Sequence, residues 1–505
     1  MPAKDANTRI IRSKTFLSKS KYMEGLQCPK LLWYEYNNKE AFPPVDPLQQ
    51  AIFDSGTKVG EVAQKLFPGG IKLEREQFPE AQSKKSTEAL KLNKPLFEAG
   101  FVFNRGYALA DILSPVKGGL WDLYEVKSST EVKEIYCEDV AFQKYIYENA
   151  GVAIRKCFLI HINNEYVRRG PIDPKGLFVS EDITGKVEEL QKEVPRKIKE
   201  LLDLISWGDV PDMEIGPHCN SPYNCVLKDI CWKSIPEKNS IFSLLRGKNK
   251  AFELAAQGIC SLLDIPIDVK LSEKQYLQVE CHKNSKVHID RKAIEKFLKQ
   301  LKYPLYFLDF ETIGPAIPEY DNSKPFEQIP FQFSLHILKK EKAAPKHYSF
   351  LAEGRADPRP EILKSLKALL GSFGSILAYK ADFEIGKIRS ATLTNPQYEK
   401  WFQKIEERFV DLLAPFRGFA YYHPAQEGSN SMKKVLPAIS GVSYDNLEIG
   451  NGSLASNEFY RVTFSPDIPQ EERLRVRSAL EEYCCLDTEG MITILKELIR
   501  RTNTG

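Results

Sequence analysis

The sequence lacks any run of about 20 apolar residues, the length that a membrane-spanning helix requires. The first residues, up to Lys21, also lack an apolar core long enough for a secretory signal peptide. Both absences argue against a membrane partner and predict a cytoplasmic location. The formal net charge is only +3, so the whole chain makes no strong field for nucleic acid, although a local basic groove is still allowed.

Cysteine is scarce for this length, with ten residues in a chain of 505, and this argues against a disulfide scaffold. Hydrophobic residues make up 42% of the sequence and charged residues 28%, which is typical of an ordinary globular protein. A chain of this length predicts two or three domains, each with its own core. The placement of the cysteines therefore matters more than their number.

The strongest signal is the stretch YFLDFET at residues 306–312, where three apolar or aromatic residues precede two carboxylates that a fourth, Phe310, separates. Aromatic enrichment after Pro304 favours a buried strand. On a strand, Asp309 and Glu311 point to one side and Phe310 points to the other. Neighbouring carboxylates repel unless a cation lies between them, and hard oxygen ligands suit Mg²⁺ or Mn²⁺. An edge strand with two solvated acids is the alternative.

A second set of polar residues lies in a β-rich block of the N-terminal half. Three strands are expected there, at residues 97–104, 107–113 and 120–128. Asp111 lies in the second strand, while Glu125 and Lys127 share one face of the third. Carboxylates can hold a cation that activates water, and a lysine can stabilise the charge that develops on phosphate. Three ordinary strands with solvated charges are the alternative.

This block resembles the RecB-like group of PD-(D/E)XK nucleases, since the three residues just named match the D…(D/E)-x-K core. Gln143 and Tyr147, four residues apart on a helix expected at residues 132–151, match the Q-x-x-x-Y motif that follows it. Glu61 falls where such nucleases often have a further acidic or histidine metal ligand. Taken alone, Glu61 would be a surface acid. The resemblance implies metal-dependent hydrolysis of phosphodiester bonds.

Three evenly spaced cysteines follow this block, Cys219, Cys225 and Cys231, in a Pro- and Asn-rich segment. Such thiols indicate soft-metal ligation, and Cys28 is the candidate fourth ligand. RecB-like iron–sulfur nucleases have one cysteine before the catalytic core and three after it, so the resemblance implies a [4Fe–4S] cluster. The spacing of the second and third cysteines departs from the commonest form, so Zn²⁺ with His218 as an alternative ligand stays open. The other cysteines are interpreted as packing residues: Cys137, Cys157, Cys260, Cys281, Cys484 and Cys485.

The C-terminal part resembles DnaQ-like exonucleases of the DEDDy type, which have an RNase H-like fold. The D-x-E pair matches the first motif of that family. In the second motif, Glu384 is the expected metal-binding carboxylate and Asp382 is the alternative. Tyr483 and Asp487, four residues apart on a helix expected at residues 471–501, match the third motif, Y-x-x-x-D. The resemblance implies two cations about 4 Å apart that hold the attacking and leaving oxygens, with Tyr483 orienting the water.

We therefore predict an α/β protein in which a helical linker joins two nuclease domains. Residues 1–235 are expected to form a PD-(D/E)XK restriction-endonuclease-like domain with the cysteine cluster, and residues 303–505 an RNase H-like domain. The linker, residues 236–302, contains a helix, a glycine turn and a helix at 254–265. This part is similar to a degenerate helix-hairpin-helix, whose turn amides contact phosphate, and a plain helical spacer is the alternative.

The predicted function is a metal-dependent DNA nuclease with two sites, including 3′–5′ trimming of single-stranded or frayed ends. By analogy with proteins that combine such folds, we expect a role in DNA processing, repair or phage defence. A nucleic-acid-binding scaffold without catalysis is an alternative, because Lys380 and Glu384 replace the asparagine and aspartate of the second motif. A second alternative is the same chemistry on RNA, since no feature of the sequence indicates whether a 2′-hydroxyl is recognised.

Overall fold

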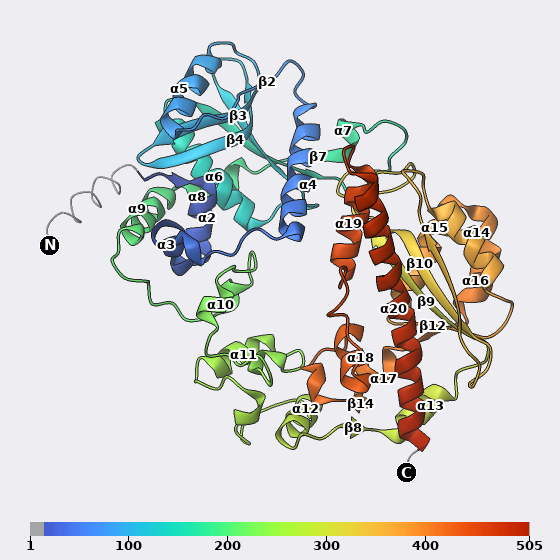
Figure 1. The fold of residues 1–505 in the computed structure, drawn as a ribbon. Helices are drawn as coiled ribbons and strands as arrows, with labels where there is room; N and C mark the ends of the chain where they lie inside the picture. The colour runs from blue at the N-terminus through green and yellow to red at the C-terminus, as the bar shows by residue number, and fades with distance from the viewer. Residues whose placement is uncertain (1–14, 504–505) are drawn as a thin grey trace. The chain divides into compact units, whose positions relative to one another are not determined.

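The computed structural model describes residues 15–503, which have mixed α/β structure with several sheets (Figure 1). The chain divides into two compact units. The first runs to Lys233 and also includes Pro315–Phe326, and the second consists of Ser234–Gly314 and the chain from Glu327 onward. Among the described helices, none combines the length and apolar character needed to cross a bilayer.

The first unit is built on a seven-stranded sheet with the order β2-β3-β4-β5-β6-β7, and β1 pairs with β4. Its strands are β1 (Leu17–Ser18), β2 (Ile71–Lys72), β3 (Leu96–Phe103), β4 (Gly106–Pro115), β5 (Trp121–Lys127), β6 (Ile154–Ile162) and β7 (Phe178–Asp182). Its helices are α2 (Lys19–Gln27), α3 (Pro29–Asn37), α4 (Pro47–Gln64), α5 (Pro79–Leu90), α6 (Glu134–Asn149), α7 (Pro174–Leu177), α8 (Thr184–Gln191), α9 (Val194–Ile205) and α10 (Lys228–Cys231). The three strands and the following helix that the sequence predicts are thereby confirmed within a few residues.

Helix α6 connects the parallel strands β5 and β6, whereas β3, β4 and β5 form an antiparallel meander. The parallel pair needs a crossover, and a helix is the usual one. Apolar residues of α6, such as Phe142 and Ile146, are fully buried in the main core of this unit. Helix α6 therefore packs on β4, the strand that carries Asp111, and brings Gln143 to Glu125 of β5 at 2.7 Å.

The second unit contains a five-stranded sheet with the order β11-β10-β9-β12-β13. The strands of this unit are β8 (His288–Ile289), β9 (Leu305–Ile313), β10 (Ile329–Leu338), β11 (Lys346–Leu351), β12 (Ser375–Ala378), β13 (Phe409–Asp411) and β14 (Tyr421–Tyr422). Its helices are α11 (Lys248–Ala255), α12 (Glu273–Lys283), α13 (Arg291–Leu298), α14 (Arg359–Leu369), α15 (Ala381–Thr394), α16 (Glu399–Glu406), α17 (Ala414–Arg417), α18 (Met432–Ser440), α19 (Gly452–Phe464) and α20 (Gln470–Asn503).

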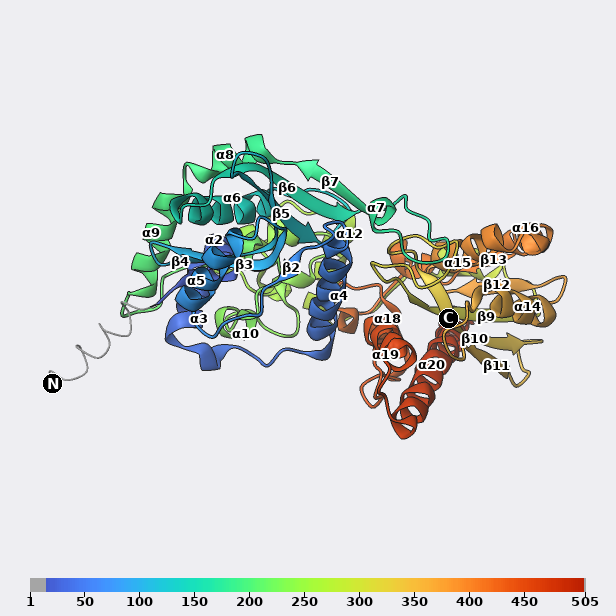
Figure 2. The same ribbon diagram turned by 90° about the horizontal axis from the view of Figure 1, so that it is seen from above.

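Strand β9 is the central strand of this sheet, antiparallel to β10 and parallel to β12. The alternative of an edge strand with two solvated acids is therefore wrong. Helices α14, α15 and α16 cover one face, where Phe310 and Phe333 are buried, and α20 packs on the other face (Figures 1 and 2). A strand covered on both faces reads as a nearly continuous apolar run, which is what the residues before Asp309 show.

Helix α20 follows directly after Pro469 and ends near the C-terminus. Acidic residues Glu471 and Glu472 lie in its first turn and Arg500 and Arg501 in its last, so both ends complement the helix dipole. Its buried face packs against β9 and β10. The expected helix at 471–501 is therefore confirmed, and it carries one wall of the candidate site.

The predicted helix-turn-helix at residues 254–265 is wrong in its second half. Helix α11 ends at Ala255, and Leu262–Asp264 forms only a single 3-10 turn. The Ser261 hydroxyl accepts the backbone N–H of Leu263, and Pro266 follows Ile265, so the chain leaves helical geometry at once. The residues of the predicted linker belong to the second unit.

Candidate functional site

Carboxylates from distant parts of the second unit converge beside the central strand. Asp309 and Glu311 of β9 and Asp487 of α20 each offer a ligand atom, and these atoms lie within 4.8 Å of one another. The register of α20 against the sheet is fixed in part by Gln332 of β10, whose amide donates to the carbonyl of Leu480 at 2.9 Å. The alternation of side chains along β9 and the register of α20 against the sheet therefore bring the three carboxylates together.

Glu384 joins this group from the start of α15. Lys380 adopts a left-handed conformation, with φ of 78°, between β12 and the helix. The carboxylate of Asp411 accepts the backbone N–H groups of Lys380 and Ala381, which fixes the turn. Glu384 then lies in the first helical turn and is only 2% exposed, whereas Asp382 is exposed. Of the two predicted acids, Glu384 is the one brought to the cluster.

The carboxylates of this cluster repel one another when they are ionised. Burial and the neighbouring carboxylates raise the pKa of Asp309 and of Glu384 well above the ordinary range. Burial and Asp487 raise the pKa of Glu311 to about 8, and burial raises the pKa of Asp487 itself to about 6. In metal-free protein, protons have to neutralise part of this charge. A divalent cation would do the same without protonation.

The carboxylate of Glu384 also has an oxygen, Oε2, that is buried and has no hydrogen-bond partner among residues 15–503. A buried polar oxygen without a partner is costly. Hard carboxylate oxygens are the ligands that Mg²⁺ and Mn²⁺ prefer. The donor set, its burial and the unpartnered oxygen therefore fit a divalent cation held by Asp309, Glu311 and Asp487, with Glu384 beside them.

Tyr483 lies one helical turn before Asp487 and is 3% exposed. Burial and the nearby carboxylates, Asp487 first, keep the pKa of its phenol far above the ordinary value. The group therefore stays protonated at neutral pH and can donate a hydrogen bond. The predicted Tyr483 and Asp487 are thus brought together with the other acids.

Three residues of this site were not found from the sequence. Lys433 of α18 donates to the carbonyl of Gly450 at 2.7 Å, and its ammonium group lowers the pKa of Glu311 and Asp487. Tyr444 donates to Asp487 Oδ1 at 2.7 Å. At Gly452, an added Cβ would lie 3.4 Å from Glu311 Oε2, which is ordinary van der Waals contact, so this glycine borders the carboxylate. These residues fall between the second and third motifs, where no spacing rule points to them.

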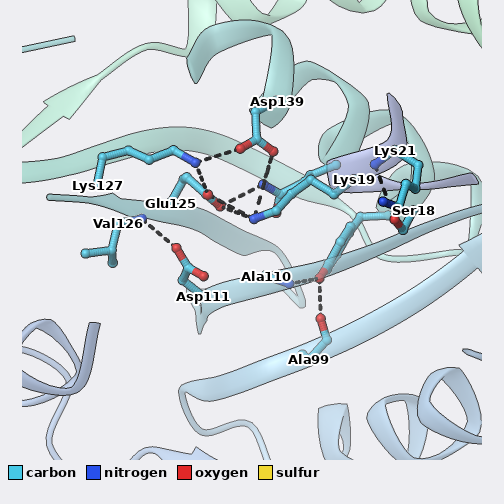
Figure 3. A network of polar contacts seen from close by, with 12 residues as sticks. Ser18, Lys19, Lys21, Ala99, Ala110, Asp111, Glu125, Val126, Lys127 and Asp139 are labelled. Atoms are coloured by element: carbon cyan, nitrogen blue, oxygen red, sulfur yellow. Dashed lines mark hydrogen bonds and ion pairs between the residues drawn. The ribbon is translucent and has the colours of Figure 1, made fainter. Parts of the chain in front are cut away.

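The first unit has a second polar centre, around Glu125 of β5, which is 2% exposed (Figure 3). Lys127 donates to Glu125 at 2.6 Å and to Asp139 at 2.7 Å. The amide of Gln143 donates to Glu125 at 2.7 Å and to Asp139 at 3.0 Å. Figure 3 shows Lys19, the first residue of α2, approaching Glu125 from the side opposite Lys127, at 2.9 Å. Sequence reasoning missed Lys19 and Asp139, although Asp139 lies one turn before Gln143 on α6.

Asp111 lies beside this network, with its Oδ2 accepting the backbone N–H of Val126 at 2.8 Å. Burial and the charge of Glu125 raise the pKa of Asp111 to about 7. Burial acts against ionisation of Glu125 as well, but Lys127 and Lys19 outweigh it and hold the pKa of Glu125 far below its ordinary value. The two carboxylates therefore differ: Glu125 is charged and neutralised by ammonium groups, whereas Asp111 titrates near neutrality.

Two predicted residues lie apart from these carboxylates. The Tyr147 hydroxyl accepts the N–H of Ala110 at 2.8 Å and donates to the carbonyl of Ala99, so it joins β4 to β3. Its contacts make it a positioning residue. Glu61 is exposed on α4, and within residues 15–503 it makes no hydrogen bond or ion pair with Asp111 or Glu125.

We expect Lys19→Met to destabilise the metal-free protein by about 1–3 kcal/mol, because buried Glu125 and Asp139 lose one of their two ammonium partners. Added Mn²⁺ should restore part of this loss by taking the place of the ammonium group. Lys21→Met is the matched control: it also removes an ion-paired lysine of α2, but Glu24 and Glu35 are more exposed, so the loss should stay under about 1 kcal/mol. Urea unfolding with and without Mn²⁺ measures both effects, and equal losses in the two variants would contradict the expectation.

The four predicted ligand cysteines line one pocket of the first unit. Cys28 and Cys219 are 7% and 6% exposed, and Cys225 and Cys231 are half-buried. All four are free thiols. Backbone N–H groups of Lys30 and Leu31 bond to the Cys28 sulfur and that of Leu227 to the Cys225 sulfur. His218 lies at the same pocket, with its Nε2 3.7 Å from the Cys219 sulfur.

Comparison with known proteins finds one matching family model, described as Domain of unknown function (DUF2779), over residues 306–431. This range begins in β9 and includes Asp309, Glu311 and Glu384 but not Asp487. It covers a minority of the chain.

Curated relatives are similar to part of the chain. The uncharacterized protein MG366 homolog of Mycoplasma pneumoniae is 27% identical over 215 residues, which is 39% of this chain and 32% of that protein. The uncharacterized protein MG366 of Mycoplasma genitalium is 28% identical over 40% of this chain and 34% of its own length. The uncharacterized protein UU173 of Ureaplasma parvum is 28% identical over 43% and 35%. The match thus spans about a third of the length of these relatives.

Proposed function

We propose that the protein is a metal-dependent nuclease whose second unit hydrolyses phosphodiester bonds at the ends of nucleic-acid strands. The observation that carries the proposal is the buried group of four carboxylates, from β9, α15 and α20, beside a protonated tyrosine. When bound, divalent cations would lower the pKa of a water molecule and neutralise charge on the phosphate. Tyr483 would donate to or orient that water, and Lys433 would offset the negative charge of the acids.

The topology of the second unit supports its likeness to DnaQ-like exonucleases of the RNase H-like fold. Three antiparallel strands, β9 to β11, are followed by parallel β12 and β13 in the order β11-β10-β9-β12-β13. The acids lie on the central strand and on the two helices expected from the three motifs. The proposed reaction is 3′–5′ removal of nucleotides from DNA.

The first unit is proposed as a second, RecB-like nuclease centre. Its support is the contact of Lys127 and Gln143 with Glu125, and the position of Asp111 on the neighbouring strand β4. A specific observation favours the alternative of a binding centre without catalysis here: Lys19 already neutralises Glu125 from the second side. Separate tests of the two units are therefore needed.

For the cysteine pocket we propose a [4Fe–4S] cluster, held by Cys28, Cys219, Cys225 and Cys231. A single Zn²⁺ would hold its sulfurs roughly 3.8 Å apart, given Zn–S bonds of about 2.3 Å. Among residues 15–503, the groups of ligand atoms that lie within 4.8 Å of each other do not include three of these thiols. The wider spacing supports a larger cluster over zinc, and the N–H groups directed at sulfur would stabilise thiolate ligands in either case.

We expect Cys219→Ser to lower the solubility of the protein before it affects chemistry, because the cluster would tie Cys28 to a segment almost 200 residues further along the chain. Iron and acid-labile sulfide, measured after anaerobic purification, should fall together with solubility. Cys157→Ser is the control, since Cys157 is a buried thiol outside the pocket. Zinc without iron in the wild type would overturn the cluster assignment.

The proposed function is tested by digesting single-stranded DNA labelled at the 5′ or the 3′ end, with Mg²⁺, Mn²⁺ or EDTA. We expect cation-dependent release of nucleotides from the 3′ end that Asp309→Asn abolishes and Lys127→Ala leaves in place. Parallel digestion of RNA of the same sequence decides between the two substrates. Absence of cleavage on every substrate, together with tight metal-independent binding, would support the scaffold alternative instead.

A further inference from the structure

A separate group of metal-ligating side chains lies on the same sheet and is not part of the carboxylate site. His336 of β10, His347 of β11 and Cys485 of α20 each offer a ligand atom, and these atoms lie within 4.8 Å of one another. His336 is buried, Cys485 half-buried and His347 exposed. No sequence motif joins the three residues, and sequence reasoning treats Cys485 as a packing residue.

The fold brings the two histidines together by strand register. His336 and His347 are direct partners in the antiparallel pairing of β10 with β11, so their side chains share a face. Their rings stack with centroids 4.5 Å apart. Helix α20 covers this face and brings Cys485, with Glu489 one turn further along.

Hydrogen bonds on the far side of the rings fix which ring nitrogens are free. Thr488 donates its hydroxyl proton to the carbonyl of Cys485 at 3.0 Å. With that donation assigned, its oxygen is the acceptor for Nδ1–H of His336, at 2.7 Å, and for the hydroxyl of Ser334, at 2.6 Å. Ser334 in turn accepts from Nε2–H of His347, at 2.9 Å. The lone pairs of His336 Nε2 and His347 Nδ1 are left without a proton.

These two lone pairs face the side chains of α20. His336 Nε2 lies 3.8 Å from Glu489 Oε1, and His347 Nδ1 lies 3.9 Å from the Cys485 sulfur. Both distances are too long for strong hydrogen bonds. They are close to the distance between two ligand atoms of a tetrahedral zinc site, which is roughly 3.5 Å for metal–ligand bonds of about 2.0–2.3 Å.

We propose that His336, His347 and Cys485 bind a zinc ion, with Glu489 as the fourth ligand. Two imidazoles, a thiolate and a carboxylate form a donor set that zinc accepts in tetrahedral geometry. The hydroxyls of Thr488 and Ser334 supply the outer hydrogen bonds that zinc-binding histidines commonly make. On binding, the Cys485 thiol loses its proton to solvent and the sulfur takes the metal in its place.

The electrostatics of the two histidines agree with this chemistry, whereas burial and Glu489 raise the pKa of Cys485 to about 11, so the metal has to displace the thiol proton. Burial and His347 lower the pKa of His336 to about 4, and burial lowers the pKa of His347 as well. Both rings are therefore neutral at pH 7, the form that binds a metal. The ion would fasten α20 to β10 and β11, directly beside the turn of the helix that carries Asp487. This inference does not depend on the proposed nuclease activity.

The test is zinc binding by the full-length protein after removal of metals, measured in excess Mg²⁺ so that the carboxylate site is occupied. We expect Cys485→Ala and His347→Ala each to bind one zinc fewer than the wild type. Cys260→Ala and His288→Ala are matched controls from the same unit and should bind as many as the wild type. With Co²⁺ in place of zinc, the difference spectrum between wild type and Cys485→Ala should contain a thiolate-to-cobalt absorption band.

Since His347 is exposed on the edge strand, His347→Ala keeps the test valid if Cys485→Ala fails to fold. Zinc bound by the cysteine pocket is common to all these variants and cancels in the comparison. Equal zinc content in the wild type, Cys485→Ala and His347→Ala would overturn the proposal.

Discussion

Replacing Glu384 with glutamine is expected to lower nuclease activity by roughly 10²- to 10³-fold, the size of effect that follows loss of a group acting on the transition state. The same substitution should raise the stability of the metal-free protein. Glutamine keeps the shape of the side chain but is neutral among the buried carboxylates without having to bind a proton. Because burial and Glu311 raise the pKa of Glu384, the neutral form is already preferred in the folded state.

The opposite signs of these two effects make the prediction specific to a metal site. A group that only supports the fold would lower activity and stability together. Activity is measured on end-labelled DNA, and stability by thermal unfolding in EDTA, where each kcal/mol corresponds to a shift of roughly 2–4 °C. Asp382→Asn is the matched control, since it removes a neighbouring but exposed acid of the same helix turn and should change neither quantity. A fully active Glu384→Gln variant would rule out the assigned ligand.

The stability that divalent cations confer is expected to be much larger at pH 8 than at pH 5. In the folded, metal-free protein the pKa of Glu311 is about 8 and that of Asp487 about 6, above their ordinary values of 4.5 and 3.8. The folded state therefore binds protons more tightly than the unfolded state. Proton binding by these two groups stabilises the folded state. This stabilisation is fully present below pH 4 and is lost as the pH rises through 6 and 8.

A tenfold difference in proton affinity corresponds to about 1.4 kcal/mol, so the loss across this range is large for a single site. Mg²⁺ or Mn²⁺ replaces the protons and should cancel the loss. The measurement is the unfolding temperature in EDTA and in Mn²⁺ at several pH values, in wild type and Glu384→Gln. We expect the gain from Mn²⁺ to increase with pH in the wild type and to shrink strongly in the variant. A gain that is the same at pH 5 and pH 8 would contradict the assigned carboxylate cluster.

Local patterns were enough to predict much of the fold. Alternation of side chains along residues 306–312 predicted a strand with Asp309 and Glu311 on one face, because the strand period is independent of the rest of the chain. The spacing of Tyr483 and Asp487 similarly required only a helix. The 3-10 turn at Leu262–Asp264 was missed, since capping by Ser261 and the nearby Pro266 outweighed the apolar helical pattern.

Residues that reach a site through tertiary packing were beyond such patterns. Lys433, Tyr444 and Gly452 come from loops and helix starts whose direction depends on how α18 and α19 pack. Lys19 meets Glu125 across 106 residues of sequence, and nothing near either residue indicates the pair. Cys485 looked like a packing residue because its histidine neighbours lie on separate strands. The candidate carboxylate ligands on β9, α15 and α20 were therefore predictable, whereas groups that meet only through tertiary packing were not.

The segment Pro315–Phe326, which connects β9 to β10 but belongs to the first unit, determines how the protein can be cut into fragments. Arg168 donates to the carbonyls of Pro318 and Glu319 at 2.8 and 2.6 Å, and Ala316 is buried in an apolar cluster with Val59 and Ile160. A fragment that starts at Ser234 would leave these contacts of the segment unmade. A fragment that ends at Lys233 would open the apolar cluster to solvent. A short glycine linker in place of the segment suits a fragment of the second unit, whereas a fragment of the first unit needs the segment supplied with it.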